Sequence, residues 1–407
     1  MTRPISLACL ALLLVAANWP GWRGPGGTGI SPEQSLPVKW SDTENVRWKV
    51  KLEGAGVGTP VVWGDRVFLT ASDGRLDDQL HIYCFSADEG KQLWHTRLFG
   101  SGRPEWYFPA GGMAIPTPVS DGKLLYALFG SGDLVCVDLD GQPVWVRSLA
   151  EEYGVFRNRW GMAASPLLVD DALIVQVDES GKSYLLAVAA KTGKTIWKTA
   201  RDTGVNWTSP AVAEVKGKKQ ILCSGTYRVE GYDLATGKEL WRVDGLRQQC
   251  VPTPVVAGDL AYVASGPKGT TFAIRLDGAT GNLTDSHIVW KSVRGTPGIP
   301  TPIRYGAYLF QIDDAGFGTC LDGGTGKEIW RERIGGRYQA SVIAGAGKLY
   351  YTSLDGVVTV ARANPKFEVL AKNRMGESIV ATPAIADGRI YIRGKDHLYC
   401  IEEKAGR

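Results

Sequence analysis

The segment from Gly231 to Trp241 reads GYDLATGKELW, a small residue and an aspartate followed by a Thr-Gly-Lys turn and a tryptophan. Related segments recur along the chain. The glycine and the tryptophan are four residues apart in five copies: Gly90 and Trp94, Gly141 and Trp145, Gly193 and Trp197, Gly237 and Trp241, Gly326 and Trp330. Glycine supplies the positive φ that a tight turn requires. Self-similarity at a regular period indicates a repeat architecture.

A second landmark opens each copy of the repeat. A Thr-Pro or Ser-Pro pair begins at Thr59, Thr117, Ser165, Ser209, Thr253, Thr301 and Thr382, and Ser341, followed by Val342, takes the remaining place. The spacing between successive copies is 40 to 58 residues, the length of a propeller blade. Because proline cannot donate a ladder hydrogen bond, the strand that it opens is predicted to be a sheet edge that faces a central channel.

These landmarks predict an all-β fold, an eight-bladed β-propeller of four-stranded antiparallel blades that spans residues 46–407. The strand at 46–50 precedes the first blade, and the eighth copy stops at Gly406 before an outer strand can follow. The N-terminal strand is therefore expected to complete the last blade and close the ring. The tryptophans predicted to dock each blade on its neighbour are Trp48, Trp94, Trp145, Trp197, Trp241, Trp290 and Trp330.

The composition and the N-terminal residues indicate which class of protein this is and where in the cell it is expected. A net charge of +4 over 407 residues is too weak for a polybasic nucleic-acid binder. Residues 1–17 have the charged start and short apolar run of a secretory signal peptide, and residues 18–45 form an N-terminal extension. The run is too short to span a membrane, so we expect an exported protein of the periplasm or cell envelope; an uncleaved N-terminal anchor is the alternative.

The cysteines do not predict a disulfide framework. Those beyond the signal lie in separate copies of the repeat, at Cys84, Cys136, Cys223, Cys250, Cys320 and Cys400. We interpret them as small buried fillers.

The repeat element at Gly231–Trp241, together with the Thr/Ser-Pro openings, resembles the tryptophan-docking repeat of pyrroloquinoline-quinone (PQQ) propellers over about residues 46–407. The leader at Trp19–Pro25 also resembles the start of PQQ-like repeat proteins of bacterial envelopes. The family includes PQQ-dependent dehydrogenases and the non-catalytic scaffold BamB of the outer-membrane assembly machinery. Membership therefore implies the fold but does not decide between these functions.

In propellers of this family, the segment before each Thr/Ser-Pro pair enters the channel from the ligand-facing rim. Candidate rim residues are Arg157, Arg159, Trp160, Asn206, Trp207, Gln248, Gln249, Arg294, Arg337, Tyr338 and Gln339. Arginine, amide and aromatic side chains converging on one mouth would suit a carboxylate, a peptide or a glycan. A solvated rim whose arginines bond to loop carbonyls is the alternative. The excursion at 100–109 either contacts a protein partner or folds back on the rim.

No catalytic or metal-binding set is evident in the sequence. A PQQ-dependent dehydrogenase would need a calcium site of carboxylate and amide oxygens, an aspartate base and a stacking tryptophan, for which Trp160 or Trp207 would serve. Acidic residues are sparse on the rim segments, where Glu105 and Glu377 are the clearest. We therefore expect no cofactor and a monomeric, non-catalytic binding scaffold with a protein partner in the envelope. The alternatives are a PQQ- and calcium-dependent quinoprotein dehydrogenase and a propeller that binds a glycan or peptide.

Overall fold

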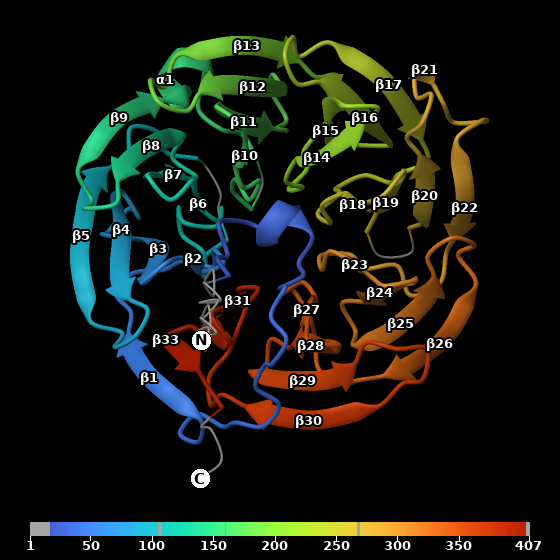
Figure 1. The fold of residues 1–407 in the computed structure, drawn as a ribbon. Coiled ribbons are helices and arrows are strands. Elements are labelled where there is room, and N and C mark those ends of the chain that lie inside the picture. The colour runs from blue at the N-terminus through green and yellow to red at the C-terminus, as the bar shows by residue number, and fades with distance from the viewer. Residues whose placement is uncertain (1–16, 105–107, 159, 267–268, 404–407) are drawn as a thin grey trace, which may run out of the picture.

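The computed structural model describes residues 17–104, 108–158, 160–266 and 269–403. In this part of the chain eight antiparallel sheets stand around a central axis (Figure 1). Residues 1–16 of the predicted signal peptide at 1–17 and the rim candidates Glu105 and Arg159 lie outside the described residues. No helix in the described ranges is long and apolar enough to cross a membrane.

The first four blades follow the chain in order. Blade 1 contains β2 (Val61–Trp63), β3 (Arg66–Asp73), β4 (Gln79–Ser86) and β5 (Gln92–Phe99). Blade 2 contains β6 (Val119–Ser120), β7 (Leu124–Leu128), β8 (Asp133–Asp138) and β9 (Pro143–Ser148), followed by α1 (Leu149–Tyr153). Blade 3 contains β10 (Leu167–Val169), β11 (Ala172–Val177), β12 (Tyr184–Ala189) and β13 (Thr195–Ala200). Blade 4 contains β14 (Ala211–Val215), β15 (Lys218–Ser224), β16 (Arg228–Asp233) and β17 (Glu239–Asp244).

The other four blades complete the ring. Blade 5 contains β18 (Val255–Ala257), β19 (Leu260–Ala264), β20 (Thr271–Arg275) and β22 (Ile288–Ser292). Blade 6 contains β23 (Ile303–Tyr305), β24 (Tyr308–Ile312), β25 (Phe317–Asp322) and β26 (Glu328–Arg333). Blade 7 contains β27 (Ile343–Gly345), β28 (Lys348–Thr352), β29 (Val357–Arg362) and β30 (Val369–Arg374). Blade 8 contains β31 (Ala384–Ala386), β32 (Arg389–Arg393) and β33 (His397–Ile401), with β1 (Val46–Lys51) as its outer strand.

The predicted ring closure is confirmed. β1 pairs with β33 in antiparallel register, Trp48 opposite Cys400 and Val50 opposite Leu398. The two ends of the propeller therefore share one sheet, and the hydrogen bonds of β1 cover an edge that would otherwise be open.

The hydrophobic core lies between the blades. Middle strands such as β4 are buried along most of their length, whereas outer strands such as β5 are largely exposed. Each buried cluster combines side chains from adjacent blades; one, for example, joins Tyr126 of blade 2 to Leu186 of blade 3. All six cysteines in the described ranges are free and buried in these interfaces.

Six of the seven predicted docking tryptophans reach the next blade. Their indole Nε1 atoms donate to a turn carbonyl there: Trp48 to Ala87, Trp94 to Leu139, Trp145 to Ala190, Trp197 to Leu234, Trp290 to Gly323 and Trp330 to Asn364, over 2.7–3.4 Å. Five of the indoles cover a turn glycine with positive φ: Gly90, Gly141, Gly193, Gly237 and Gly326. A Cβ atom at these glycines would lie 2.4–2.8 Å from the ring. The glycine therefore provides both the turn conformation and the space for the indole.

Trp241 departs from the predicted docking on a turn. Its fully buried indole packs against Gly231 of its own blade and within the cluster that joins blades 4 and 5, and Nε1 donates to Gln220 Oε1 at 2.8 Å. The cause is the insertion in blade 5, where the short strand β21 (Gly281–Asn282) pairs in parallel with β17 and adds a fifth strand to blade 4. This added strand places Gly281 opposite Trp241, but the indole does not cover that glycine, since no atom lies within 4 Å of where its Cβ would stand.

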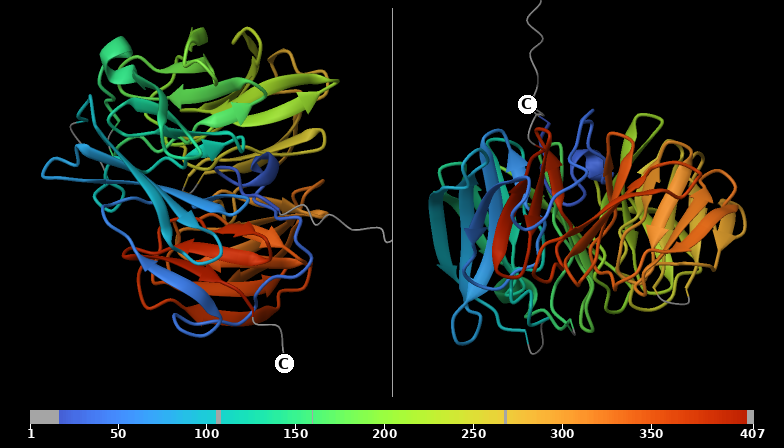
Figure 2. Two further views of the ribbon diagram at one scale, coloured as in Figure 1. Left: turned by 60° about the vertical axis from the view of Figure 1, so that its left-hand side comes forward. Right: turned by 90° about the horizontal axis from the view of Figure 1, so that it is seen from below.

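The N-terminal extension runs across one end of the channel before the chain enters β1 (Figures 1 and 2). It begins with an antiparallel bridge between Trp19 and Val62, forms the 3₁₀ turn η1 (Pro25–Gly27) and returns along blade 7. There the backbone N–H of the buried Trp40 donates to Asn373 Oδ1. The propeller therefore has one covered face and one face where the channel opens.

Candidate functional site

Hydroxyl groups form an inner ring around the channel. The backbone N–H of the residue that opens a blade donates to the hydroxyl of the corresponding residue in the next blade, over 2.9–3.1 Å. These links are Thr59 to Thr117, Thr117 to Ser165, Ser165 to Ser209, Thr253 to Thr301, Thr301 to Ser341 and Ser341 to Thr382. In six of the eight blades the hydroxyl at this position thus connects neighbouring blades. This role explains why the position before the proline is threonine or serine, because only a hydroxyl side chain can accept the hydrogen bond there. The missing N–H of proline does not account for this choice.

Among the described residues the ring lacks two links, one between Thr382 and Thr59 and one between Ser209 and Thr253, and Trp22 enters at the second. Between Ser209 and Thr253 the described residues show no such hydrogen bond, and Thr253 Oγ1 instead accepts from Trp22 Nε1 at 2.9 Å. The indole divides the channel into two cavities, of about 570 Å³ toward the open mouth and about 370 Å³ toward η1. Trp22, Ser165, Ser209 and Thr253 line both cavities. Trp22 is therefore the floor of the cavity at the mouth.

A buried arginine fixes this floor. Arg23 is 1% exposed, and its guanidinium donates to the carbonyls of Val342, Pro302 and Thr28. Burial lowers the pKa of Arg23 to about 9. Hydrogen bonds from charged donors are stronger than neutral ones, so the contacts with Pro302 and Val342 hold the extension against blades 6 and 7, and the contact with Thr28 lies within the extension.

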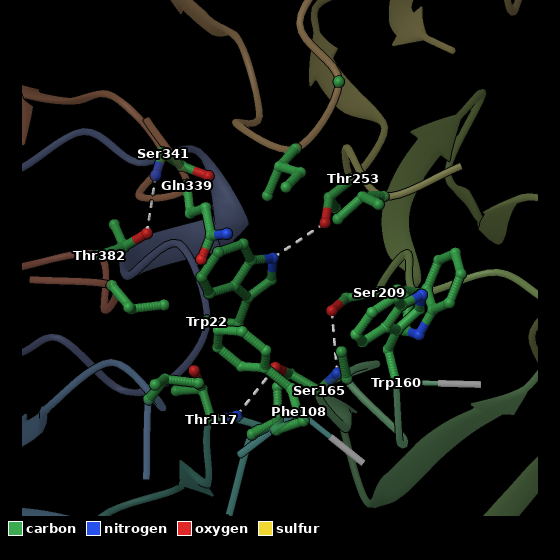
Figure 3. A pocket seen from close by; sticks show the side chains of 18 of the residues that line it. Trp22, Phe108, Thr117, Trp160, Ser165, Ser209, Thr253, Gln339, Ser341 and Thr382 are labelled. Atoms are coloured by element: carbon green, nitrogen blue, oxygen red, sulfur yellow. Dashed lines mark hydrogen bonds between the residues drawn. The ribbon is translucent and has the colours of Figure 1, made fainter. Parts of the chain in front are cut away.

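The mouth cavity is lined by one to three residues from each inter-blade loop (Figure 3). Aromatic rings come from Trp22, Phe108, Trp160 and Trp207, amides from Gln249 and Gln339, and the remaining surface is mainly aliphatic groups and the hydroxyls of the ring. Asp314, in the turn between β24 and β25, is the only charged side chain among the described lining residues. A concave, largely apolar cavity with few convergent polar groups is typical of ligand sites.

Neighbouring loops hold one another in place around the mouth. The Phe108 N–H donates to the carbonyl of Trp160 at 3.0 Å, and Trp207 Nε1 donates to the carbonyl of Gly161 at 3.0 Å. Trp160 and Gln249 have positive φ values of 84° and 62°, a conformation that costs free energy for non-glycine residues. Strained backbone of this kind is often found at binding sites, and the Trp160 side chain is 51% exposed.

The Asp314 carboxyl is held by the backbone of the preceding loop. Oδ1 accepts from the N–H groups of Gly298 at 3.1 Å and Ile299 at 3.0 Å. Burial raises the pKa of Asp314, and these two hydrogen bonds act in the opposite direction. The carboxyl is thus fixed in position at the cavity wall.

The structure brings together only some of the predicted rim residues. Trp160, Trp207, Gln249 and Gln339 line the mouth cavity. Asn206 and Tyr338 are buried, and Arg157, Gln248, Arg294 and Arg337 are exposed residues that do not line it. The arginines of the described residues therefore contribute no side chain to the cavity, although the segments of Arg157 and Arg337 also carry the lining residues Trp160 and Gln339.

Asn206 belongs to a buried polar network that the sequence did not reveal. Its Oδ1 accepts from the Cys250 N–H at 2.9 Å, and Asn158 Nδ2 donates to its carbonyl at 3.0 Å. Close by, Arg201 pairs with Asp178 and Glu230, each at 2.8 Å, with its side chain fully buried. These residues come from distant strands and inter-blade loops, so no local motif marks them. The network fixes the loop that carries Trp207.

The lining does not match the set that PQQ requires. PQQ is a tricarboxylate quinone, and a protein that holds it needs cationic partners together with oxygen ligands for calcium. The described lining contains no lysine or arginine, and its one carboxylate already accepts two backbone hydrogen bonds. Among the described residues, no three His, Cys, Asp or Glu side chains lie close enough to hold a metal ion together.

A sequence profile of the family described as outer membrane protein assembly factor BamB matches residues 36–183, 181–304 and 319–407. The chain belongs to this family of PQQ-like repeat propellers. It is 27% identical over 236 residues to the outer membrane protein assembly factor BamB of Burkholderia pseudomallei (strain K96243), covering 57% of this chain and 56% of that protein. It is 23% identical over 276 residues to the polyvinylalcohol dehydrogenase of a Pseudomonas species, covering 55% of this chain and 40% of that protein. The chain spans about half the length of the curated relatives it matches.

Solved structures from both branches of the family share the fold. BamB from Moraxella catarrhalis has a TM-score of 0.64 at 14% identity, covering 88% of this chain and 99% of that chain. The quinohemoprotein alcohol dehydrogenase from Comamonas testosteroni has a TM-score of 0.68 at 14% identity, covering 96% of this chain and 81% of that chain. At this level of identity the likeness establishes the fold alone, and function depends on the site.

Proposed function

We propose that this protein is a non-catalytic binding propeller of the bacterial cell envelope, which holds a ligand or a segment of a partner protein in the aromatic mouth of its channel. The observation that carries the proposal is the composition of the mouth cavity: an indole floor, aromatic and hydroxyl walls and a single carboxylate. This surface suits binding, and its described residues offer no assembled nucleophile or general base pair.

The relatedness to BamB supports the same class. The Burkholderia relative carries the name of an outer membrane assembly factor, and its match covers more than half of this chain. We infer from it an exported protein with a protein partner in the envelope.

Cleavage of the proposed signal peptide after Ala17 would leave Asn18 as the first residue, whose Oδ1 accepts from the Gly64 N–H at 2.8 Å. Mass spectrometry of the protein recovered from a periplasmic extract is expected to find Asn18 at the N-terminus; a protein that retains Met1 in the cytoplasmic fraction would contradict export.

The competing function is that of a quinoprotein dehydrogenase, favoured by the relatedness to polyvinylalcohol dehydrogenase. In that case a residue such as Trp160 or Trp207 would stack on the quinone, and cations from outside the described lining would be needed for its carboxylates. The proposal of a binding protein requires instead that PQQ has no specific place in the channel.

Reconstitution separates the two functions. The purified protein is incubated with PQQ and Ca²⁺, and oxidation of primary alcohols, sugars and polyvinyl alcohol is followed with an artificial electron acceptor. A dehydrogenase of the family serves as the positive control. We expect no oxidation above the rate of free PQQ and no quinone retained after gel filtration. Calcium-dependent oxidation with one equivalent of retained quinone would overturn the proposal.

A further inference from the structure

The charge of the mouth cavity is unusual for a site in a protein of net charge +4. Asp314 stands alone among apolar and uncharged polar side chains in the described lining. Its Oδ1 atom accepts from Gly298 and Ile299, while Oδ2 receives no hydrogen bond from any described residue. One carboxylate oxygen is therefore available to a ligand that supplies a positive charge or a hydrogen-bond donor.

The aromatic residues of the same cavity offer mainly their ring surfaces. Trp22 Nε1 already donates to Thr253 Oγ1, and Trp207 Nε1 already donates to the carbonyl of Gly161. A ligand would meet these indoles through their π systems and not through their N–H groups. An aromatic ring attracts a cation that lies over its face, and a desolvated site strengthens the attraction to about 2 kcal/mol.

The polar groups of the walls restrict the ligand further. The hydroxyls of Thr117, Ser165, Ser209 and Ser341 each accept a backbone N–H from the preceding blade. Each of these hydroxyls still has an O–H donor, and the lining adds the side-chain amides of Gln249 and Gln339. A sugar needs many convergent hydrogen bonds, and an anion needs a cationic partner, whereas an organic cation needs only a carboxylate and an aromatic or aliphatic surface.

From this combination we propose that the channel mouth binds an organic cation, an ammonium or guanidinium group attached to an apolar body, with the charged group at Asp314 and the apolar body against Trp160 and Trp207. The inference rests on the proposed binding function and names its ligand class. The cation belongs either to a small free amine or to a basic side chain of a partner peptide, which share this chemistry.

Three ligands of one shape test the charge requirement. Benzylamine, benzyl alcohol and benzoate carry the same ring with a positive, zero and negative charge at neutral pH. Isothermal titration calorimetry with the mature protein at pH 7.5 and low salt is expected to give tighter binding of benzylamine than of benzyl alcohol by about ten-fold, with benzoate weakest. Raising the salt should narrow the difference between benzylamine and benzyl alcohol, because screening weakens the attraction to Asp314.

Matched variants locate the effect. Asp314→Asn keeps the acceptor for Gly298 and Ile299 and removes the charge, so it should abolish the preference for benzylamine and leave the affinity for benzyl alcohol unchanged. Asp313→Asn is the control, because Asp313 is the adjacent acid and does not line the cavity. Trp160→Ala should weaken benzylamine and benzyl alcohol alike. Thermal melts followed by circular dichroism check that each variant is folded.

The source of the cation is tested with a second pair of ligands. A capped Phe-Lys dipeptide and its Phe-norleucine counterpart differ only in the terminal ammonium group. Preference for the lysine peptide over benzylamine would point to a partner segment, and the reverse to a small amine. Equal binding of benzylamine and benzyl alcohol by the wild-type protein, a charge preference that survives Asp314→Asn, or no heat with benzylamine would overturn the inference. None of these outcomes depends on PQQ, so a failure here is distinct from alcohol oxidation in the reconstitution experiment.

Discussion

Trp22 Nε1 lies 2.9 Å from Thr253 Oγ1, so a residue of the N-terminal extension occupies the hydroxyl that the inner ring would otherwise use to join blade 4 to blade 5. The extension therefore packs against the propeller and also contributes the floor of the mouth cavity. Because Trp22 separates the two cavities, the depth of the mouth depends on a segment that lies far from the other lining residues in the sequence.

Replacing Trp22 tests this relationship. Trp22→Phe keeps a ring in the channel and loses the hydrogen bond to Thr253, which should lower the free energy of unfolding by about 1 kcal/mol. Trp22→Ala also removes the half-buried indole and should cost about 2 kcal/mol more, while joining the two cavities. Chemical denaturation measures the stability, and xenon or a small aromatic ligand soaked into crystals reveals the joined cavity. Equal stability of both variants and the wild-type protein would mean that Trp22 is not held in the channel.

The turn glycines under the docking tryptophans allow a matched comparison. Gly193 has φ of +71°, and a Cβ atom there would meet the Trp145 indole at 2.8 Å; Gly258 has φ of +61° and no atom within 4 Å of that position. Gly258→Ala should therefore cost about 1 kcal/mol from the backbone conformation alone. Gly193→Ala should cost about 1–3 kcal/mol more, because the indole must move. Similar losses for both variants would contradict a docking role for Trp145.

The architecture was predictable because the sequence pattern of a blade recurs eight times along the chain. A copy with both residues supplies two halves of one repeated contact, since its turn glycine lies under the tryptophan of the preceding blade and its tryptophan reaches the turn of the next blade. The departure at Trp241 shows the limit of this reasoning. Its own sequence fits the pattern well, and the deviation arises from the insertion at Gly281, in the following blade.

The site was predicted less well, since it depends on where loop side chains point. The segments before the Thr/Ser-Pro pairs do reach the mouth, and Trp160, Trp207, Gln249 and Gln339 line it. Exposed Arg157 lies on such a segment as well, but nothing in the local sequence distinguishes a side chain that enters the channel from one that leaves it. Asp314 was missed because it lies in a hairpin turn within a blade, a position where aspartate ordinarily serves the turn itself.

Acid sensitivity is expected from a pair of histidines in blade 1. His81 Nδ1 lies 2.8 Å from His95 Nε2, and His81 Nε2 lies 2.9 Å from Asp73 Oδ1. Burial first, and then the neighbouring His81 and Arg97, lower the pKa of His95 below 6.5, against the opposing charges of Glu53 and Asp73. As the pH falls through 6.5, the unfolded chain therefore binds a proton that the folded protein does not, and stability is lost.

The measurement is the melting temperature between pH 7.5 and 5. The wild-type protein should lose stability across this range, and His95→Gln should flatten the part of the profile that lies just below pH 6.5. His287→Gln serves as the control, because His287 lies in the blade 5 insertion and contacts Ser286 instead. A profile that His95→Gln leaves unchanged would assign the acid sensitivity to other groups.

Ring closure carries a pH dependence of its own. At the junction of blades 8 and 1, Arg47 and Arg389 each contact both Glu402 and Asp88, so the strand that closes the ring is tied to the C-terminal segment and to the first blade. Burial raises the pKa of Glu402, but the hydrogen bonds from Arg47 and Arg389 outweigh it and leave the pKa below 4.5. The resulting stabilisation is present above pH 4.5 and is lost as the pH falls through the lowered pKa.

Glu402→Gln should lower the melting temperature at pH 7 and make little difference to it near pH 3. Glu403→Gln, at the exposed neighbouring residue, is the control and should leave the melting temperature unchanged at both pH values. If Glu402→Gln melts like the wild-type protein at pH 7, the closure is held by the pairing of β1 with β33 and by Trp48, and the charges at the junction are dispensable.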